Sequence, residues 1–261
     1  MFDWLNRGGV VTYERKGSGP PLIILPGVMA DAIGWLPVAN AITLANPVIV
    51  INRRGRAPSP DLGADYGVPT EVEDLARLVS SIGKPVHLFG WSYGGLVAIE
   101  AAANGIPLRT LTAYEPVSKP FAPQTVKTIQ DALAAGDPDR AVEIINCDVS
   151  GFDTGYVQAL RRTAEWQHLV ELALPLGAEM AAINSYEPQF SRYENIGTAT
   201  TLIVGQQSQG GAPYGTAFER FVKALPQASV HVLPNQGHLA HVVDPRSLAD
   251  HITKSVCRNL S

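Results

Sequence analysis

The sequence has few of the features that mark secreted, membrane-spanning or disulfide-stabilised proteins. It contains only two cysteines, Cys147 and Cys257, in 261 residues. Two thiols so far apart could pair, but they do not make a disulfide framework, and we expect both to be unpaired and mostly buried. No apolar run has the length needed to span a bilayer, and residues 1–7 lack the basic and apolar regions of a signal peptide. These absences predict a cytoplasmic protein without a membrane partner.

Basic clusters and metal-binding patterns are equally scarce. The formal net charge is −4, and the densest basic stretch is the short run at 52–56, so we expect no nucleic-acid partner. No cysteine and histidine residues have the spacing of a metal site, and residues 55–63 do not form a phosphate-binding loop. The sequence therefore predicts neither a metal nor a cofactor, and it leaves a small-molecule substrate as the expected partner.

Apolar segments that end at turn residues alternate with segments of helical spacing through most of the chain. Helices are predicted at 32–44 and at 70–82, where a Thr-Glu-Val-Glu capping box opens the second one, and a last helix begins near Pro245. Many of the apolar runs are continuous, which is typical of strands buried on both faces. This alternation predicts an α/β fold with a doubly wound, mostly parallel sheet. Strands are predicted at 10–14, 22–25, 47–51, 86–89, 109–114, 200–204 and 230–233.

Residues 117–197 break this rhythm because they contain no convincing strand. Helical spacing instead covers 125–135, 138–145, 154–172 and 176–184. We expect a core domain of residues 1–116 and 198–261, with residues 117–197 as a helical lid over the strand ends, where α/β sheets bind ligands. The alternative is that these helices only pack on the sheet.

Residues 90–94 read Gly-Trp-Ser-Tyr-Gly and are the most informative stretch of the chain. An apolar run precedes them and a helix-forming run follows, so Ser92 is predicted at a sharp turn from strand to helix. The glycines let strand and helix approach closely, and the strained turn exposes the hydroxyl. The pattern predicts Ser92 as a nucleophile, whereas the alternative is an ordinary glycine-rich turn.

A serine nucleophile needs a base, and the oxyanion that its attack creates needs hydrogen-bond donors. His238 is the best candidate for the base because it follows a glycine in the loop after the last predicted strand. For the oxyanion we expect the backbone N–H of Tyr93, the residue after the serine. The second donor is expected in the loop after residue 25, with Val28 as first choice and Met29 as second.

Together these motifs resemble the α/β-hydrolase superfamily, in its serine esterase and lipase branch. The resemblance rests on residues 25–27, 52–56, 90–95 and 114–116 and on the Gly-His pair at 237–238. It implies a Ser–acid–His order along the chain. Residues 26–27 are Pro-Gly where the family often has His-Gly, which preserves the backbone role. Many members carry the acid in a Gly-x-x-Asp turn, but here that turn ends in Ser208.

Glu115 is the candidate for the missing acid. It ends the predicted strand 109–114, at the same edge of the sheet as Ser92, and some α/β-hydrolases carry their acid there. An alternative is that Glu115 pairs with an arginine, such as Arg54, as a structural support. Asp244 suits a helix N-cap better.

The expected pocket is apolar and aromatic, with Met29, Trp91 and Trp166 in its wall, although each could equally belong to the core. The resemblance implies a serine hydrolase that cleaves a carboxylic ester, thioester or lactone with a hydrophobic body through an acyl-enzyme. Alternatives are a non-hydrolytic enzyme of the same fold, such as a lyase, cyclase or perhydrolase-type haloperoxidase, and a small-molecule binding protein.

Overall fold

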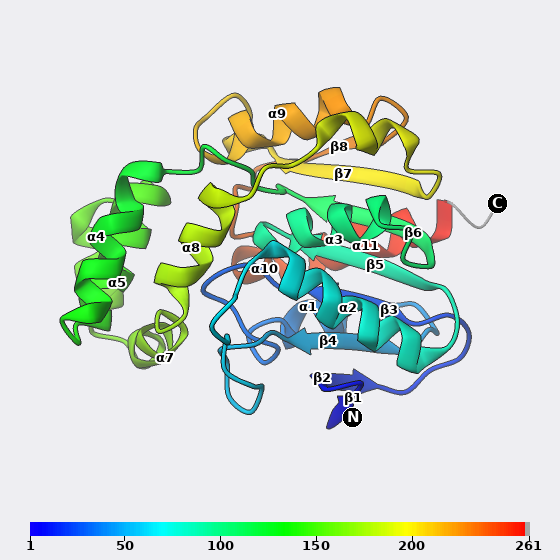
Figure 1. Ribbon diagram of the computed structural model, residues 1–261, viewed down its shortest axis with the longest axis horizontal. Coiled ribbons are helices and arrows are strands. Elements are labelled where there is room, and N and C mark those ends of the chain that lie inside the picture. Colours follow the sequence, from blue (N-terminus) through cyan, green and yellow to red (C-terminus); the bar gives the residue numbers. More distant parts are fainter. Residues whose placement is uncertain (259–261) are drawn as a thin grey trace.

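Within residues 1–258, which the computed structural model describes, eight strands form one sheet in the order β1-β2-β4-β3-β5-β6-β7-β8 (Figure 1). β2 pairs antiparallel with β1 and β4, and all the other neighbours are parallel. The predicted doubly wound, mostly parallel sheet is therefore confirmed. The strands are β1 (Phe2–Arg7), β2 (Val10–Arg15), β3 (Leu22–Leu25), β4 (Val48–Asn52), β5 (Val86–Trp91), β6 (Leu108–Tyr114), β7 (Ala199–Gly205) and β8 (Ser229–Leu233).

The predicted strands match the observed ones to within one or two residues at each end. β1 is the one observed strand that was not predicted. β1 lies at the edge of the sheet and is mostly exposed, so it lacks the apolar run that identifies the inner strands. β3, β4 and β5 are buried along their whole length, as expected for strands covered on both faces.

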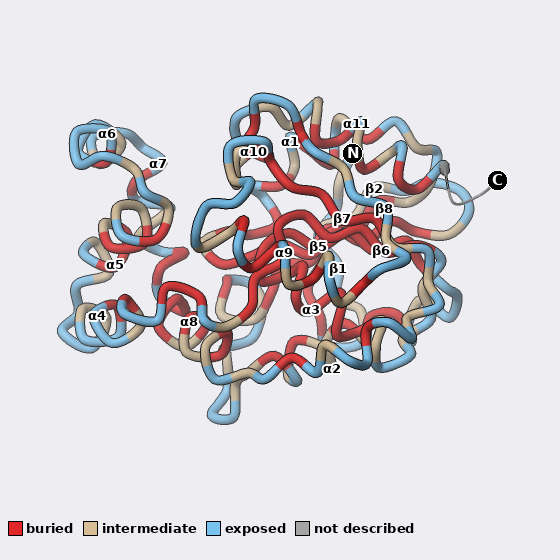
Figure 2. Tube along the Cα trace, turned by 90° about the horizontal axis from the view of Figure 1, so that it is seen from above, coloured by how far each residue is buried: buried red, intermediate tan, exposed pale blue. Residues whose placement is uncertain are grey.

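Helices cover both faces of the sheet (Figure 2). On one face, α2 (Val68–Ile82), α3 (Tyr93–Ala103) and α9 (Tyr214–Ala224) contribute to the larger apolar cluster. On the other, α1 (Leu36–Ala41) and α11 (Pro245–Arg258) pack together, next to the short α10 (Ala240–Val243). No helix within residues 1–258 has the length and apolarity required to cross a bilayer.

Several predicted helix boundaries are wrong. α2 begins before the expected capping box, with Gly67 as its N-cap and a proline in its first turn. α1 is shorter than the predicted 32–44 because residues 32–35 form a turn, in which Asp31 Oδ1 accepts a hydrogen bond from the Gly34 N–H at 2.7 Å. α9, which follows a glycine-rich segment, is absent from the predicted helices.

The segment between β6 and β7 contains helices and no strand, and it lies to one side of the sheet (Figures 1 and 2). We call α4–α8 the cap helices. The predicted single helix at 154–172 is wrong, because a turn at 161–163 divides it. The cap helices are α4 (Pro123–Ala134), α5 (Pro138–Ile144), α6 (Thr154–Leu160), α7 (Ala164–Leu172) and α8 (Leu176–Ser185), with a π-helical turn at Ile145–Val149.

Both cysteines are unpaired, as predicted. Cys147 packs partly buried against the larger apolar cluster, whereas Cys257 is exposed, which contradicts the expectation that both thiols are buried.

Candidate active site

Ser92 lies at the turn between β5 and α3, in a backbone conformation that side-chain-bearing residues rarely adopt. Its φ is 57° and its ψ is −120°, and its side chain is almost fully buried. Such strain persists only where the surroundings hold it. Here the Ser92 N–H donates to Tyr114 O at 2.9 Å, and the Ser92 carbonyl accepts from the Gly95 N–H at 2.9 Å. The predicted strand–turn–helix setting is thus present, with Ser92 at its tip.

Glu115 and His238 meet beside this turn. Glu115 Oε2 lies 2.6 Å from His238 Nδ1, while Glu115 Oε1 accepts a hydrogen bond from the Gly205 N–H at 2.8 Å. The Glu115 side chain is fully buried and that of His238 is 9% exposed. Arg54, the alternative partner of Glu115, instead pairs with Asp74 through two hydrogen bonds of 2.7 and 2.8 Å. The carboxylate is therefore placed to orient the imidazole and to fix its tautomer.

Aromatic side chains hold His238 from two sides. The ring of Tyr214, at the start of α9, stacks on the imidazole with 3.7 Å between centroids and 16° between planes. Trp91 lies 4.8 Å from the imidazole, and its indole N–H donates to the His238 carbonyl at 2.9 Å. The Tyr114 hydroxyl donates to the carbonyl of Gly237. Both the ring and the backbone of His238 are thereby fixed.

The loop after β3 passes directly beside Ser92. A Cβ atom on Gly27 would lie only 2.7 Å from Ser92 Cβ, so only glycine permits this approach. Met29, two residues further on, has a left-handed φ of 54°. The N–H groups of Val28 and Tyr93 donate to no other residue among residues 1–258, which leaves both available to a ligand.

Ser92 and His238 line one cavity of about 330 Å³, a volume typical of small-molecule sites. Its wall comes from the loop after β3, from the loop around His238 and from the cap helices. Predicted pocket residues Met29 and Trp91 are part of it. Most of the exposed lining is apolar, and the cap contributes Ile145, Phe152, Tyr156, Leu160, Leu169 and Leu172.

Trp166, the third predicted pocket residue, does not line this cavity. It is buried within the cap, where its indole N–H donates to Asp139 Oδ2 at 2.5 Å and the Arg161 guanidinium lies 4.9 Å from its ring. The prediction for Trp166 is therefore wrong. Helical spacing indicates that the Trp166 side chain is buried. It does not indicate whether that side chain faces the cavity or the interior of the cap.

Two carboxylates face the cavity, and no lysine or arginine is among its described lining residues. Asp31 lies in the loop before α1 and Glu165 in α7. Asp31 Oδ2 is 3.3 Å from Nε2 of His168, which also belongs to α7. The two carboxylates disfavour an anionic ligand in this part of the cavity.

His241 is a cavity residue that the sequence did not single out. Its imidazole stacks on Trp35, with 4.8 Å between centroids and 1° between planes, and lies 4.2 Å from Trp91. Burial, with a smaller contribution from His238, lowers the pKa of His241 to about 3. His241 is thus a neutral, polar part of the wall near neutral pH.

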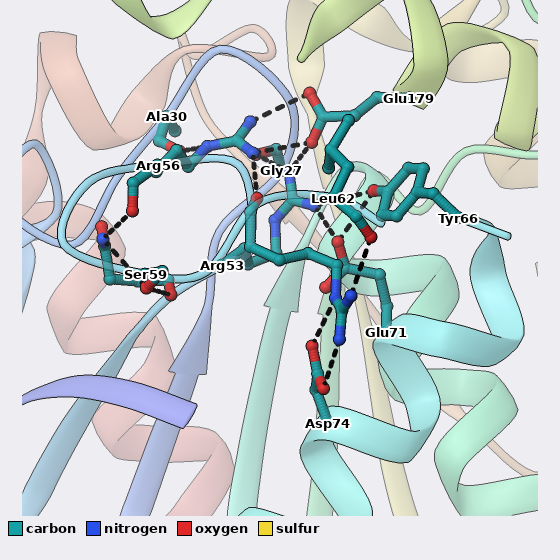
Figure 3. Close-up of polar contacts among 12 residues, drawn as sticks. Gly27, Ala30, Arg53, Arg56, Ser59, Leu62, Tyr66, Glu71, Asp74 and Glu179 are labelled. Carbon is teal, nitrogen blue, oxygen red and sulfur yellow. Dashed lines mark hydrogen bonds and ion pairs between the residues drawn. The ribbon is translucent and has the colours of Figure 1, made fainter. Parts of the chain in front are cut away.

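Beneath the loop after β3 lies a buried cluster of two arginines and two glutamates (Figure 3). Arg53 and Arg56 follow β4, Glu71 belongs to α2 and Glu179 belongs to the cap helix α8. All four side chains are at most 3% exposed. Burial would lower the pKa of Arg53, but Glu179 and Glu71 raise it well above its ordinary value. The cluster is therefore charged, and its charges balance.

The comparisons with known proteins agree with this fold. The chain belongs to the alpha/beta hydrolase family, whose model matches residues 22–251. Among solved structures, an alpha/beta hydrolase from Sphaerobacter thermophilus superposes with a TM-score of 0.81 at 25% identity, covering 97% of this chain and 99% of that one. The enol-lactonase from Burkholderia xenovorans shares the fold with a TM-score of 0.77 at 16% identity, covering 99% of both chains.

Curated relatives that match parts of the chain are hydrolases. N-formylmaleamate deformylase of Pseudomonas putida is 37% identical over 110 residues, which is 40% of each chain. A pimeloyl-(acyl-carrier protein) methyl ester esterase of Aeromonas hydrophila is 33% identical over 95 residues, or 36% of each chain. The chain thus matches well under half the length of these curated relatives. Their substrates are therefore not assigned to this chain.

Proposed function

We propose that this protein is a serine hydrolase that cleaves uncharged carboxylic esters, thioesters or lactones with a hydrophobic acyl body. The observation that carries the proposal is the 2.6 Å contact between Glu115 and His238 in the wall of the cavity that also holds Ser92. A serine hydroxyl at a strained turn, with an imidazole oriented by a buried carboxylate, has the three parts that nucleophilic catalysis needs. Hydrolase relatives in the same family support the reaction class.

In this mechanism Ser92 Oγ attacks the carbonyl carbon, and His238 takes the hydroxyl proton. Because Nδ1 faces Glu115, Nε2 is the nitrogen that serves as the base. Glu115 stabilises the imidazolium that results. The N–H groups of Tyr93 and Val28, which have no partner among the described residues, bind the oxyanion. His238 then protonates the leaving alcohol or thiol, and water activated by the same imidazole releases the acid from the acyl-enzyme.

The cavity wall supports the choice of substrate. An apolar lining with carboxylates and without lysine or arginine favours a hydrophobic, uncharged acyl chain. The cap helices supply much of the wall, and we assign them the role of a lid that excludes water from the reacting carbonyl. The volume of about 330 Å³ suits an acyl group of moderate size rather than a long lipid chain.

The test uses a fluorophosphonate probe followed by identification of the labelled peptide. The wild-type protein should be labelled at Ser92 and should hydrolyse p-nitrophenyl hexanoate with a burst of p-nitrophenol. Ser92→Ala should lose both signals, whereas the matched control Ser185→Ala, at the end of α8, should keep them. Unlabelled, folded wild-type protein would contradict the proposal. Hydrolysis of the ester that survives in Ser92→Ala but not in His238→Ala would instead indicate that the imidazole activates water directly, without an acyl-enzyme.

A further inference from the structure

The loop that carries the Val28 N–H is held at both ends by arginine side chains. Arg53 Nη2 donates to Gly27 O at 2.8 Å, and Arg56 Nε donates to Ala30 O at 2.6 Å (Figure 3). Between these two carbonyls lies Met29, whose left-handed φ of 54° costs energy for a residue with a side chain. The two guanidinium groups thus hold a strained peptide segment in one conformation.

Both arginines are in turn held by one carboxylate from the cap. Glu179 Oε1 lies 2.5 Å from Arg53 Nη2 and 2.9 Å from Arg56 Nη1, and Glu179 Oε2 accepts from Arg56 Nη2 at 3.0 Å. Glu179 is fully buried in α8, 126 positions from Arg53. Burial alone would raise the pKa of this carboxyl, but the charges of Arg53 and Arg56 hold it below its ordinary value.

The rest of the cluster cannot replace Glu179. Arg53 Nη1 is already bound to Glu71 Oε1 at 2.7 Å, and Glu71 also accepts from the Tyr66 hydroxyl at 2.8 Å. Arg56 has no other carboxylate partner among the described residues. Two arginines balance two glutamates, so loss of the Glu179 charge leaves one uncompensated positive charge in the interior. Such a charge is costly enough to draw its side chain toward water.

We infer that Glu179 is a positioning residue for the oxyanion-binding amide of Val28. Through Arg53 and Arg56 it fixes the carbonyls on either side of Val28 and Met29. The position of that amide therefore depends on the cap helix that carries Glu179. The inference rests on the proposed serine hydrolysis. Glu179 is not among the described residues that line the cavity, so it acts through the two arginines. Its effect is therefore on the charged transition state and not on the neutral substrate, because only the former needs the amide in place.

The test is Glu179→Gln, which keeps the shape of the side chain and removes its charge. Loss of one oxyanion donor typically costs about 100-fold to 1000-fold in kcat, and displacement of the loop should cost about tenfold to 100-fold, with KM changed by less than about threefold. The exposed Glu171→Gln in α7 is the matched control and should behave as wild type. Each variant is compared on p-nitrophenyl hexanoate at equal ester concentrations.

The distinguishing readout is inhibition by a pair of alkyl ketones of equal length. A trifluoromethyl ketone forms a charged hemiketal on the serine and needs the oxyanion donors, whereas the methyl ketone binds as a neutral substrate analogue. In Glu179→Gln the trifluoromethyl ketone should lose affinity by the same factor as kcat/KM, and the methyl ketone should not change. A purely structural role would shift both together or neither.

A second variant covers the case in which Glu179→Gln does not fold. Arg56→Lys keeps the ion pair with Glu179 but removes the Nε donor to Ala30 O, and it should show the same selective loss toward the trifluoromethyl ketone. The inference is overturned if folded Glu179→Gln binds the two ketones with the same affinity ratio as wild type. If Glu179→Gln does not fold, the same result in Arg56→Lys overturns it. In both cases the proposed hydrolase function is unaffected. A wild-type protein that forms no hemiketal on Ser92 overturns the proposed function itself, and the inference with it.

Discussion

Glu115 and His238 are separated by 123 positions in the chain, yet the carboxylate oxygen Oε2 and the imidazole Nδ1 lie 2.6 Å apart. The contact exists because β6 and β8 end at the same edge of a parallel sheet, with β7 between them. The other oxygen of Glu115 is held by the Gly205 N–H at the end of β7. The carboxylate is thus anchored to the sheet on one side and directs the imidazole on the other.

Glu115→Gln should abolish most of the activity without unfolding the protein. The amide oxygen can still accept from Gly205, but its NH₂ group then faces Nδ1 and forces the proton onto Nε2, where it prevents proton uptake from Ser92. A wrong tautomer of this kind costs about 10⁴-fold in kcat in serine hydrolases that have been studied. Steady-state kinetics and the melting temperature of the variant test this. The control is Glu187→Gln, at an exposed glutamate paired with Lys119. A decrease in kcat of less than tenfold in Glu115→Gln would contradict the role of Glu115 as the catalytic acid.

Tyr214 should matter through its ring rather than its hydroxyl. The ring stacks 3.7 Å from the imidazole of His238, whereas Ser150 Oγ, at 3.3 Å, is the only hydrogen-bond partner of the hydroxyl within residues 1–258. Aromatic pairs contribute roughly 0.5–1.5 kcal/mol beyond the area they bury, so Tyr214→Leu should lower kcat/KM about threefold to tenfold. Tyr214→Phe is the matched control and should stay within twofold of wild type. Equal losses in both variants would assign the effect to the hydroxyl.

His241 should make the folded protein less stable in acid. Its pKa is lowered from 6.5 to about 3 in the folded state, chiefly by burial. As the pH falls below 6.5, the unfolded chain binds a proton at this imidazole and the folded protein does not. The free energy of unfolding should therefore be undiminished above pH 6.5 and decrease toward pH 3, by up to about 1.4 kcal/mol per pH unit from this residue.

Denaturant titrations of wild type and His241→Phe between pH 7 and pH 4 measure this contribution. The phenylalanine ring preserves the stack on Trp35 and cannot be protonated, so the variant should lose stability less steeply with falling pH. Parallel pH dependence in the two proteins would show that His241 is protonated in the folded state as readily as in the unfolded one.

The charge of the cavity should affect kcat/KM differently for neutral and anionic esters. The dimethyl ester of a short dicarboxylic acid is neutral, while its monomethyl ester carries a carboxylate at pH 7.5. The carboxylates of Asp31 and Glu165 repel that charge, and no lysine or arginine is among the described lining residues, so kcat/KM for the monoester should be lower by about tenfold or more at low ionic strength.

Glu165→Gln should narrow this difference by accelerating the monoester alone, and added salt should narrow it in wild type as well. Glu171→Gln, on the same helix but outside the cavity lining, is the control. A wild-type protein that prefers the monoester would refute the assignment of an uncharged acyl group.

Local sequence patterns predicted the sheet and the position of Ser92 well, for a physical reason. Buried parallel strands need continuous apolar runs, and a sharp strand-to-helix turn needs glycine on both sides of the serine, so both leave a signal within a few residues. The resemblance to α/β-hydrolases indicated Glu115, because the turn in which many members carry the acid ends here in Ser208. Its contact with His238 follows from which strands are neighbours in the sheet.

Features that depend on contacts between distant segments left no such signal. The pairing of Arg53 with Glu179 joins a core loop to a cap helix. The sequence around either residue contains no pattern that predicts the other as its partner. Trp166 was misplaced because the faces of the cap helices were not known. Tyr214 was missed because α9 follows a glycine-rich segment in which no helix was predicted, although its ring is the nearest aromatic group to the imidazole of His238.

The ion cluster of Arg53, Arg56, Glu71 and Glu179 also limits how this protein can be redesigned. Exchange of lid segments between related hydrolases assumes that the lid is an independent module. Here a foreign segment without an acid at the place of Glu179 would leave the buried Arg56 without its carboxylate partner. A chimaera would therefore have to carry α8 across intact, or replace Arg56 at the same time, before exchanged cap helices could be tested for a new specificity.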